Sequence, residues 1–262
     1  MILTQNNPVK KYSRIVSLVP SQTELLSYLG LEEEVVGITK FCIHPDKWFR
    51  NKTRIGGTKN INIKKIHQLS PDLIIANKEE NIKEQVEELS EKYDVLVTDV
   101  NNFSEALNMI ADIGALAQRE ESASNIILKL NEGFRKLKNS FLDRKKIPAA
   151  YFIWKDPYMV AGGDTFINEM MQYCGLENVF ADHKRYPKIT LEEIKEKKVE
   201  LILLSSEPYP FKEKHKEEIQ KQVGVIKVEL VDGEMFSWYG NRLLNSIDYF
   251  QTFVQNLQSN LT

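Results

Sequence analysis

The chain has 262 residues, enough for one large hydrophobic core or two modest ones, and its formal net charge is −2. Basic residues are dispersed among acidic ones, so the charge pattern favours neither nucleic acid nor an anionic membrane surface as a partner. No apolar run reaches the ~18 residues of a membrane-spanning helix. The residues before Ile15 do not resemble a secretory signal, so either the chain stays inside the cell or its leader has been replaced.

Short apolar runs alternate with helical patterns through the first part of the chain. The run Arg14–Val19 predicts a strand, and Ser21-Gln22-Thr23-Glu24 has the form of a capping box that opens a helix ending at Gly30. Further strands are predicted over residues 35–38, 73–76 and 95–97, and further helices over 63–69, 82–93 and 104–117. This alternation favours a parallel sheet.

One long amphipathic helix is predicted over Arg119–Arg144, where apolar residues recur at three-and-four spacing from Ala123 to Phe141. Acidic residues stand at its start and basic ones toward its end, the order that complements the helix dipole. About 24 residues at 1.5 Å each give a length of roughly 36 Å. We expect a stiff connector that permits small movements of the parts it joins, with Gly133 as its weak point.

The same alternation restarts beyond this helix. Strands are predicted over residues 149–153, 157–160, 201–204 and 225–230. Asp164 or Thr165 caps a helix that ends at Cys174, and Thr190-Leu191-Glu192-Glu193 is a second capping box. A final amphipathic helix covers residues 239–257.

An internal repeat links the two halves. Four apolar positions of the first half recur about 128 positions later in the second; these are Ile63, Ile66, Leu73 and Ile74, matched by Leu191, Ile194, Leu201 and Ile202. The predicted fold class is therefore α/β, with two Rossmann-like lobes that contain parallel sheets, residues 1–118 and 147–262. The long helix, residues 119–146, connects them.

Aromatic and polar residues gather in the loops that follow the predicted strands, where ligands of parallel α/β sheets usually bind. All three tryptophans, Trp48, Trp154 and Trp238, fall in these loops, as do Glu207 and Glu234. Aromatic side chains beside a few polar groups suit a flat, partly apolar ligand held between two lobes, or they pad contacts between loop and sheet.

Signatures of catalysis and of metal binding are missing from the sequence, which has no Gly-rich nucleotide loop, Walker loop, nucleophile elbow or zinc-protease motif. His44 is the best candidate metal ligand among four histidines, and a structural role suits it as well. Cys42 and Cys174 are expected to be buried free thiols, unless their geometry allows a disulfide. Ser21 stands at a predicted helix start. Either the free N–H groups there receive an anionic group of a ligand, or the residue simply caps the helix.

Several segments, by their order and spacing, resemble the class III substrate-binding proteins of ABC importers, and among them the vitamin B12-binding proteins. The resemblance runs from Arg14 to Leu257, and the segments that carry it are Arg14–Ser21 with Thr23-Glu24, Ile55-Gly56-Gly57, Pro71–Ile75 and Gly175–Phe180. It implies the helical-backbone periplasmic-binding-protein fold. It also implies a non-catalytic solute-binding protein without an intrinsic cofactor, in which cobalamin or a similar corrinoid lies between the lobes.

The resemblance further implies which residues contact the ligand. Phe41 stands at the position of a stacking tyrosine, whereas Thr58 and Tyr186 replace two tryptophans of the B12-binding proteins. Glu234 and Trp238 fall on the positions of an acid and a base. The candidate ligand-binding residues are Ser21, Phe41, Thr58, Lys59, Trp154, Tyr158, Tyr186, Glu207, Glu234, Trp238 and Tyr239.

Proteins of this class dock on an ABC permease through one acidic residue on each lobe. Glu192 keeps the acid of the second lobe, whereas Lys64 stands at the position of the acid of the first lobe. The charge at the first-lobe contact with the permease is therefore reversed. The resemblance implies a periplasmic or membrane-anchored extracytoplasmic location, and a cytoplasmic one stays open. We expect a monomer that binds a small molecule and no nucleic acid.

Three other interpretations stay open. The same fold could bind haem, a ferric siderophore or, through His44, a metal ion. The chain could be a cytosolic ligand sensor that signals by lobe closure. It could also be an enzyme acting between the lobes, with Glu207 and Glu234 as the most plausible catalytic carboxylates of the loops.

Overall fold

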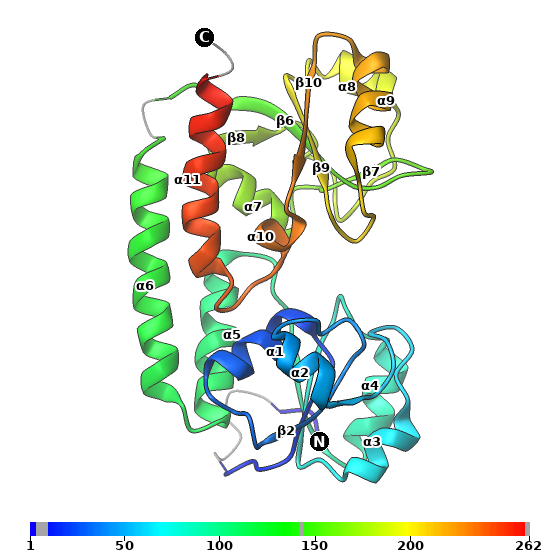
Figure 1. Cartoon of the computed structure of the whole chain (residues 1–262), viewed down its shortest axis with the longest axis vertical. Helices are drawn as coiled ribbons and strands as arrows, with labels where there is room; N and C mark the ends of the chain where they lie inside the picture. Colours follow the sequence, from blue (N-terminus) through cyan, green and yellow to red (C-terminus); the bar gives the residue numbers. More distant parts are fainter. Residues whose placement is uncertain (4–9, 142–143, 260–262) are drawn as a thin grey trace. The chain divides into compact units, whose positions relative to one another are not determined.

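The computed structural model of the protein describes residues 1–3, 10–141 and 144–259 (Figure 1). Its contacts divide the chain into two compact units. Unit 1 comprises Met1–Val100, Ser104–Lys129 and Tyr239–Arg242, and unit 2 comprises Asn101–Phe103, Leu130–Trp238 and Leu243–Thr262. The units are therefore not two contiguous halves, because each contains a short segment that lies in the sequence within the other unit: Tyr239–Arg242 in unit 1 and Asn101–Phe103 in unit 2.

Unit 1 contains a five-stranded sheet in the order β3-β2-β1-β4-β5, and all neighbouring strands are parallel. The strands are β1 (Ile15–Ser17), β2 (Val35–Ile38), β3 (Thr53–Arg54), β4 (Leu73–Asn77) and β5 (Asp94–Thr98). The helices are α1 (Pro20–Tyr28), α2 (Asp46–Asn51), α3 (Ile63–Leu69), α4 (Lys83–Ser90) and α5 (Phe103–Leu116). Strand order reverses at β1, so the carboxyl ends of β1 and β4 form the switch point where open α/β sheets bind ligands.

The central strand β4 is buried along its whole length, as expected for a parallel strand covered on both faces. Apolar residues of α3 and α4, including Ile66 and Val86, pack with Ile74 and Val95 of the sheet. The predicted parallel α/β class is confirmed for this unit.

Helix α1 begins one residue before the predicted capping box. Pro20 lies in its first turn, Val19 is the N-cap residue, and no side chain caps the helix. Proline suits this position because its missing N–H and fixed φ are compatible with a first turn. The predicted capping box of Ser21 and Glu24 is therefore wrong.

The second predicted capping box is confirmed at the start of α8 (Leu191–Glu196). Thr190 Oγ1 accepts a hydrogen bond from the Glu193 N–H at 3.3 Å, and Glu193 Oε2 accepts one from the Thr190 N–H at 2.7 Å. Thr165 caps α7 (Phe166–Tyr173) in the same manner, by accepting from the Asn168 N–H at 3.3 Å.

The predicted long helix is α6 (Glu120–Asn139), which is shorter at both ends than the sequence pattern suggested. Its predicted apolar stripe is confirmed, since Ala123, Ile126, Leu130, Phe134 and Leu137 are all buried. Residues of α6 up to Lys129 belong to unit 1 and those from Leu130 belong to unit 2.

Unit 2 contains the sheet β10-β9-β6-β7, with β8 paired to the start of β6. The strands are β6 (Ile147–Trp154), β7 (Met159–Val160), β8 (Leu176–Asn178), β9 (Leu201–Ser205) and β10 (Lys227–Val231). All pairs are parallel except β6 with β7, which turns back antiparallel. The remaining helices are α9 (Glu213–Val223), α10 (Gly233–Ser237) and α11 (Leu243–Ser259).

Helix α11 lies alongside the unit 2 part of α6 (Figure 1). Gly133 permits this approach, since a Cβ atom there would lie 2.2 Å from Ile247 Cδ1. The residue predicted as the weak point of the long helix is thus a packing contact between two helices.

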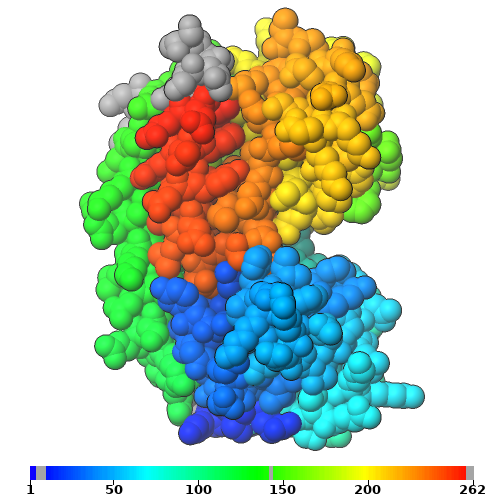
Figure 2. Space-filling model, in the orientation of Figure 1, coloured from blue at the N-terminus to red at the C-terminus, as the bar shows by residue number. Residues whose placement is uncertain are grey.

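Several elements of unit 2 differ from the sequence prediction, among them β8 and α10, which had not been predicted. Strand β10 begins at Lys227 rather than Val225, which is fully exposed, and α11 begins at Leu243 rather than Tyr239. Helix α9 had not been predicted, because only His215, Ile219 and Val223 of its residues are buried. Figure 2 shows α9 in the yellow-to-orange part of the surface of unit 2.

Candidate ligand-binding site

Phe41 is the most exposed aromatic side chain at the carboxyl edge of the unit 1 sheet. It lies three residues beyond the end of β2 and is 50% exposed. The ammonium group of Lys40 lies over its ring, 5.0 Å from the centroid. A Cβ atom at Gly57 would lie 3.2 Å from the Phe41 ring and 3.3 Å from Lys40 Cε, so glycine leaves room for this pair.

The other candidate residues of unit 1 differ in how accessible they are. Ser21 and Thr58 are buried, and the Thr58 carbonyl accepts a hydrogen bond from Asn81 Nδ2 at 3.1 Å. Lys59 is exposed, and its ammonium group donates to the carbonyl of Glu79. Phe41 and Lys59 therefore offer more surface to a ligand than Ser21 or Thr58.

Tyr239 begins the short segment Tyr239–Arg242 of unit 1, which lies in the sequence between two segments of unit 2. Its side chain is buried and hydrogen-bonded to Ser21, and burial raises the pKa of its phenol well above the ordinary value. The Tyr239 hydroxyl therefore stays neutral, and its hydrogen bond with Ser21 stabilises the first turn of α1.

Trp154 leads an aromatic cluster at the carboxyl end of β6. It is 41% exposed, and its ring meets that of Tyr209 edge to face at 5.7 Å. Tyr209 in turn contacts Phe211 at 4.7 Å and His215 at 5.4 Å, with its hydroxyl 3.3 Å from His215 Nε2. One face of this cluster is buried in unit 2, and Trp154 presents the other side to solvent.

Tyr158 and Tyr186 are the two partly buried aromatic candidates of unit 2. Tyr158 packs on Phe152 of the core at 5.4 Å. The guanidinium carbon of Arg185 lies 5.8 Å from the centroid of the Tyr186 ring. The carbonyl of Pro187 accepts from the Val160 N–H at 3.1 Å, so this segment runs beside β7.

Glu207 and Trp238 are engaged with each other. One carboxylate oxygen of Glu207 accepts from Trp238 Nε1 at 2.8 Å and from Ser237 Oγ at 2.6 Å. Burial raises the pKa of Glu207, and the nearby carboxylates of Glu234 and Asp232 raise it further. The two hydrogen bonds from Ser237 and Trp238 lower the pKa and only partly offset this rise. The arrangement holds the indole of Trp238 and shields it almost completely from solvent.

Close packing behind Glu207 depends on one glycine. A Cβ atom at Gly233 would lie 2.4 Å from Ser205 Oγ and 2.6 Å from Glu207 Cγ. The short helix α10 therefore approaches the end of β9 only because this residue has no side chain.

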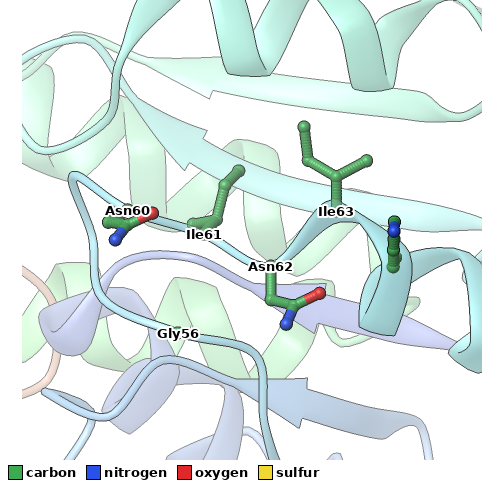
Figure 3. A pocket seen from close by; sticks show the side chains of 6 residues that line it. Gly56, Asn60, Ile61, Asn62 and Ile63 are labelled. Atoms are coloured by element: carbon green, nitrogen blue, oxygen red, sulfur yellow. The ribbon is translucent and has the colours of Figure 1, made fainter.

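A shallow hollow in unit 1 lies where the loop after Gly56 enters α3 (Figure 3). Figure 3 shows the side chains of Asn62 and Ile63 on opposite sides of this segment. Asn62 Oδ1 accepts from the Lys65 N–H at 3.0 Å and so caps α3. Lys64, the candidate docking residue of the first half, lines the hollow and is exposed.

Glu192 is the corresponding candidate in unit 2 and lies exposed in the first turn of α8. The repeat thus places Lys64 and Glu192 at equivalent positions of capped helices, with opposite charges.

No cluster of three or more His, Cys, Asp or Glu side chains that could hold a metal ion occurs within residues 1–3, 10–141 and 144–259. His44 is partly exposed in the loop after β2. Cys42 and Cys174 are buried free thiols, as the sequence suggested. In the same described ranges, no helix combines the length and apolar character that crossing a bilayer requires.

Sequence reasoning missed Lys40, Arg185 and Arg242. The first two immediately precede the aromatic candidates Phe41 and Tyr186, and this adjacency is a signal that could have identified them. Arg242 had no such signal, because its partner Glu24 lies 218 residues away in the sequence.

Two α/β units with largely parallel sheets, a long helix shared by both, and exposed aromatic side chains at carboxyl-end loops define a solute-binding protein of the helical-backbone class. Residues 15–229 match the family model described as periplasmic binding protein. The chain belongs to this family and is a class III substrate-binding protein of the ABC transporter type.

Individual relatives agree with this assignment. The chain is 27% identical over 254 residues to YvrC, an ABC transporter substrate-binding lipoprotein of Bacillus subtilis, covering 91% of this chain and 79% of that protein. The periplasmic vitamin B12-binding protein of Vibrio cholerae is similar in structure, with a TM-score of 0.80, 21% identity, and coverage of 94% of this chain and 98% of that one. A periplasmic haem-binding protein of Pseudomonas aeruginosa gives a TM-score of 0.79 at 16% identity, covering 91% of each chain. The fold predicted from the sequence is confirmed.

Proposed function

We propose that the protein is a non-catalytic receptor for a large metal chelate, such as a corrinoid, a haem or a ferric chelate, which it delivers to an ABC permease. The observation that carries the proposal is the exposure of Phe41 and Trp154 at the carboxyl edges of their sheets, where α/β proteins bind ligands. The names of similar proteins, which include vitamin B12-binding and haem-binding proteins, support a chelate as the ligand.

The candidate contacts divide into two groups. Phe41, Trp154, Tyr158 and Tyr186 offer flat apolar surface to a conjugated macrocycle, since aromatic side chains stack on such rings. Lys59 offers an exposed polar group. Ser21, Thr58, Glu207, Glu234, Trp238 and Tyr239 support the loops and touch the ligand through the small surfaces that they expose.

Titration calorimetry with cobalamin, haem and ferric citrate tests the proposal. At least one chelate is expected to bind with one-to-one stoichiometry, and Phe41→Ala and Trp154→Ala each to weaken it by about tenfold. Tyr28→Ala is the matched control, because Tyr28 is 51% exposed near the end of α1, away from the carboxyl edge. No heat with any chelate would refute the proposal.

The permease contact is the second part of the proposal. Glu192 on α8 and Lys64 on α3 are the docking candidates, and their opposite charges call for a permease surface that is basic at one contact and acidic at the other. We place the protein on the extracytoplasmic side, as in its lipoprotein and periplasmic relatives. Glu192→Lys and Lys64→Glu should each reduce binding to reconstituted permease without altering chelate affinity.

A further inference from the structure

We infer that His215 is a positioning residue for Trp154, and that it holds this indole in its ligand-binding position only while the imidazole is neutral. Both residues belong to unit 2. The inference rests on the proposed function, in which Trp154 contacts the chelate, and it adds a proton-dependent support for that contact.

A chain of contacts runs from Trp154 to His215 within unit 2. The Trp154 indole meets the Tyr209 ring edge to face at 5.7 Å, and across the described part of the chain no other ring contacts this indole. The Tyr209 ring lies 5.4 Å from that of His215, and its hydroxyl lies 3.3 Å from Nε2. The position of Trp154 therefore depends on Tyr209, whose polar end is held by His215.

The backbone at the start of α9 determines which nitrogen of His215 carries the proton. His215 stands in the first turn of α9, three residues after the N-cap residue Lys212, and its Nδ1 accepts from the Lys212 N–H at 3.0 Å. A nitrogen that accepts carries no hydrogen, so the proton of the neutral ring is on Nε2, which donates to the Tyr209 hydroxyl. One neutral imidazole thus holds both the helix start and Tyr209.

A second proton on the ring would break this arrangement. The N–H of a protonated Nδ1 would face the N–H of Lys212, so two donors would oppose each other and the helix start would lose its acceptor. The positive charge would also lie at the amino end of α9, where the helix dipole disfavours a cation. Because His215 is only 7% exposed, water relieves neither effect unless the ring moves outward.

The charged groups around His215 favour the neutral ring. Burial lowers the pKa of His215, and the cations of Lys155 in the turn after β6 and of Lys212 and Lys214 on α9 lower it further. Glu218, one turn along α9, acts in the opposite direction, but its carboxylate pairs with Lys155 Nζ at 2.5 Å.

The direction of the pH dependence follows from the lowered pKa. Above the ordinary histidine pKa of about 6.5 the ring is neutral, and Tyr209 and Trp154 are held in place. As pH falls below that value and through the lowered pKa of the folded protein, the ring takes up a proton and releases them. Acidification should therefore weaken the contact that unit 2 makes through Trp154.

The emission of Trp154 tests the inference without any chelate. Trp48 and Trp238 are buried, so subtracting the spectrum of Trp154→Phe from that of the parent isolates the exposed indole. As pH is lowered from 8 to 4.5, this emission should shift to longer wavelength and its quenching by acrylamide should increase by about twofold. An unchanged Trp154 spectrum across this range, in protein that circular dichroism shows to be folded, would overturn the inference.

His215→Gln is the conservative variant that does not titrate. Glutamine is a usual partner at this position of a capping box, so its oxygen replaces Nδ1 as the acceptor from Lys212 and its amide replaces Nε2 as the donor to Tyr209. The Trp154 emission of this variant should stay constant from pH 8 to 4.5. If it changes as in the parent, another group titrates and the assignment to His215 is wrong.

His67→Gln is the matched control in unit 1, because His67 Nδ1 lies 2.9 Å from the Tyr93 hydroxyl and so forms a similar pair away from Trp154. This variant should keep the pH profile of the parent. Loss of the profile in the control as well would show that the emission does not report on His215.

Binding at constant pH separates positioning from stability. Cyanocobalamin and haem are each titrated at pH 7.5 into the parent, His215→Ala and His215→Gln. His215→Ala removes both hydrogen bonds and should weaken the probe that binds by about tenfold, as Trp154→Ala does, whereas His215→Gln should stay within about twofold of the parent. Folded His215→Ala that binds as tightly as the parent would overturn the inference, and if this variant does not fold, the pH profile of His215→Gln decides.

The outcomes distinguish this inference from the proposed function. If cyanocobalamin, haem and ferric citrate all fail to bind the parent, the proposed function fails, whereas the Trp154 emission still decides whether His215 holds the indole. If a probe binds but the emission does not change with pH, the role of His215 is lost and the chelate receptor remains.

Discussion

Arg242 donates two hydrogen bonds to Glu24, from Nε to one carboxylate oxygen and from Nη2 to the other, both at 2.7 Å. Both side chains are largely buried, at 9% and 16% exposure. Residues 239–242 return to unit 1 from the far end of the chain, and this bidentate pair fixes them against α1. The pair also places Tyr239 beside Ser21, which is one of the candidate ligand contacts.

Removing the charge of Glu24 should therefore destabilise the protein. Glu24→Gln removes the negative charge from a bidentate pair with a largely buried guanidinium, and we expect a loss of about 2–3 kcal/mol in the free energy of unfolding. Urea unfolding followed by circular dichroism measures it. Glu87→Gln is the control, because its pair with Lys83 is exposed and should contribute less than about 0.5 kcal/mol. Equal losses in the two variants would contradict the role assigned to Arg242.

Glu207 should make stability depend on pH in the opposite sense to an ordinary salt-bridged acid. Burial raises its pKa in the folded protein, so the folded state holds the proton more tightly than the unfolded state. Stability is then full below the ordinary pKa of a glutamate and falls as pH rises through the raised value.

Glu207→Gln tests this directly, because a glutamine oxygen still accepts from Ser237 and Trp238 while carrying no charge. The variant should be at least as stable as the parent at pH 8 and should lose that advantage at pH 4. Urea midpoints at the two pH values measure the effect, and parallel midpoints would count against it. Glu207→Ala, which removes the acceptor, should be less stable at both, by about 1–3 kcal/mol.

The packing of Gly133 against Ile247 predicts a change of sign between two backgrounds. Alanine is favoured over glycine inside a helix by about 1 kcal/mol, but its Cβ atom would lie 2.2 Å from Ile247 Cδ1. Gly133→Ala should be neutral or destabilising in the parent, and stabilising by up to about 1 kcal/mol once Ile247→Val has removed Cδ1. Thermal unfolding of the parent, the two single variants and the double variant measures this coupling. Additive effects of the two substitutions on stability would disprove it.

The two cysteines should be inert in the folded protein. Both thiols are buried, burial raises the pKa of each, and Thr23 and Thr39 contact Cys42 Sγ at 3.1 Å. Only the thiolate reacts with Ellman's reagent, so we expect two thiols to react in denaturant and none within an hour without it. Rapid reaction of either in the folded state would show that the loop after β2 or the end of α7 opens.

The elements that sequence alone predicted are those whose signals are local. The capping box at Thr190 and the apolar stripe of α6 each lie within a few turns of one helix, and the structure confirms both. The first capping box failed because the carboxylate of Glu24 bonds a residue 218 positions away, which no local pattern contains. Helix α9 was not predicted because only three of its residues are buried, which gives too weak an apolar periodicity.

The candidate site was partly predictable for the same reason. Exposed aromatic residues after strands identify the loops, whereas the cations over Phe41 and Tyr186 depend on how the side chains lie. The hydrogen bond from Trp238 to Glu207 joins residues 31 positions apart in two loops, so no local sequence pattern contains it. Trp238 is buried by this contact rather than exposed to a ligand.

Hydrogen exchange with and without bound haem tests the central claim most directly, because it asks where a chelate binds. We predict slower exchange in the loops around Phe41, Trp154 and Arg185, and no change around Lys92 or Arg144 at the amino ends of the strands. Protection confined to those amino ends, or no protection at a haem concentration that saturates the spectral change, would contradict a chelate receptor that binds through its carboxyl-end loops.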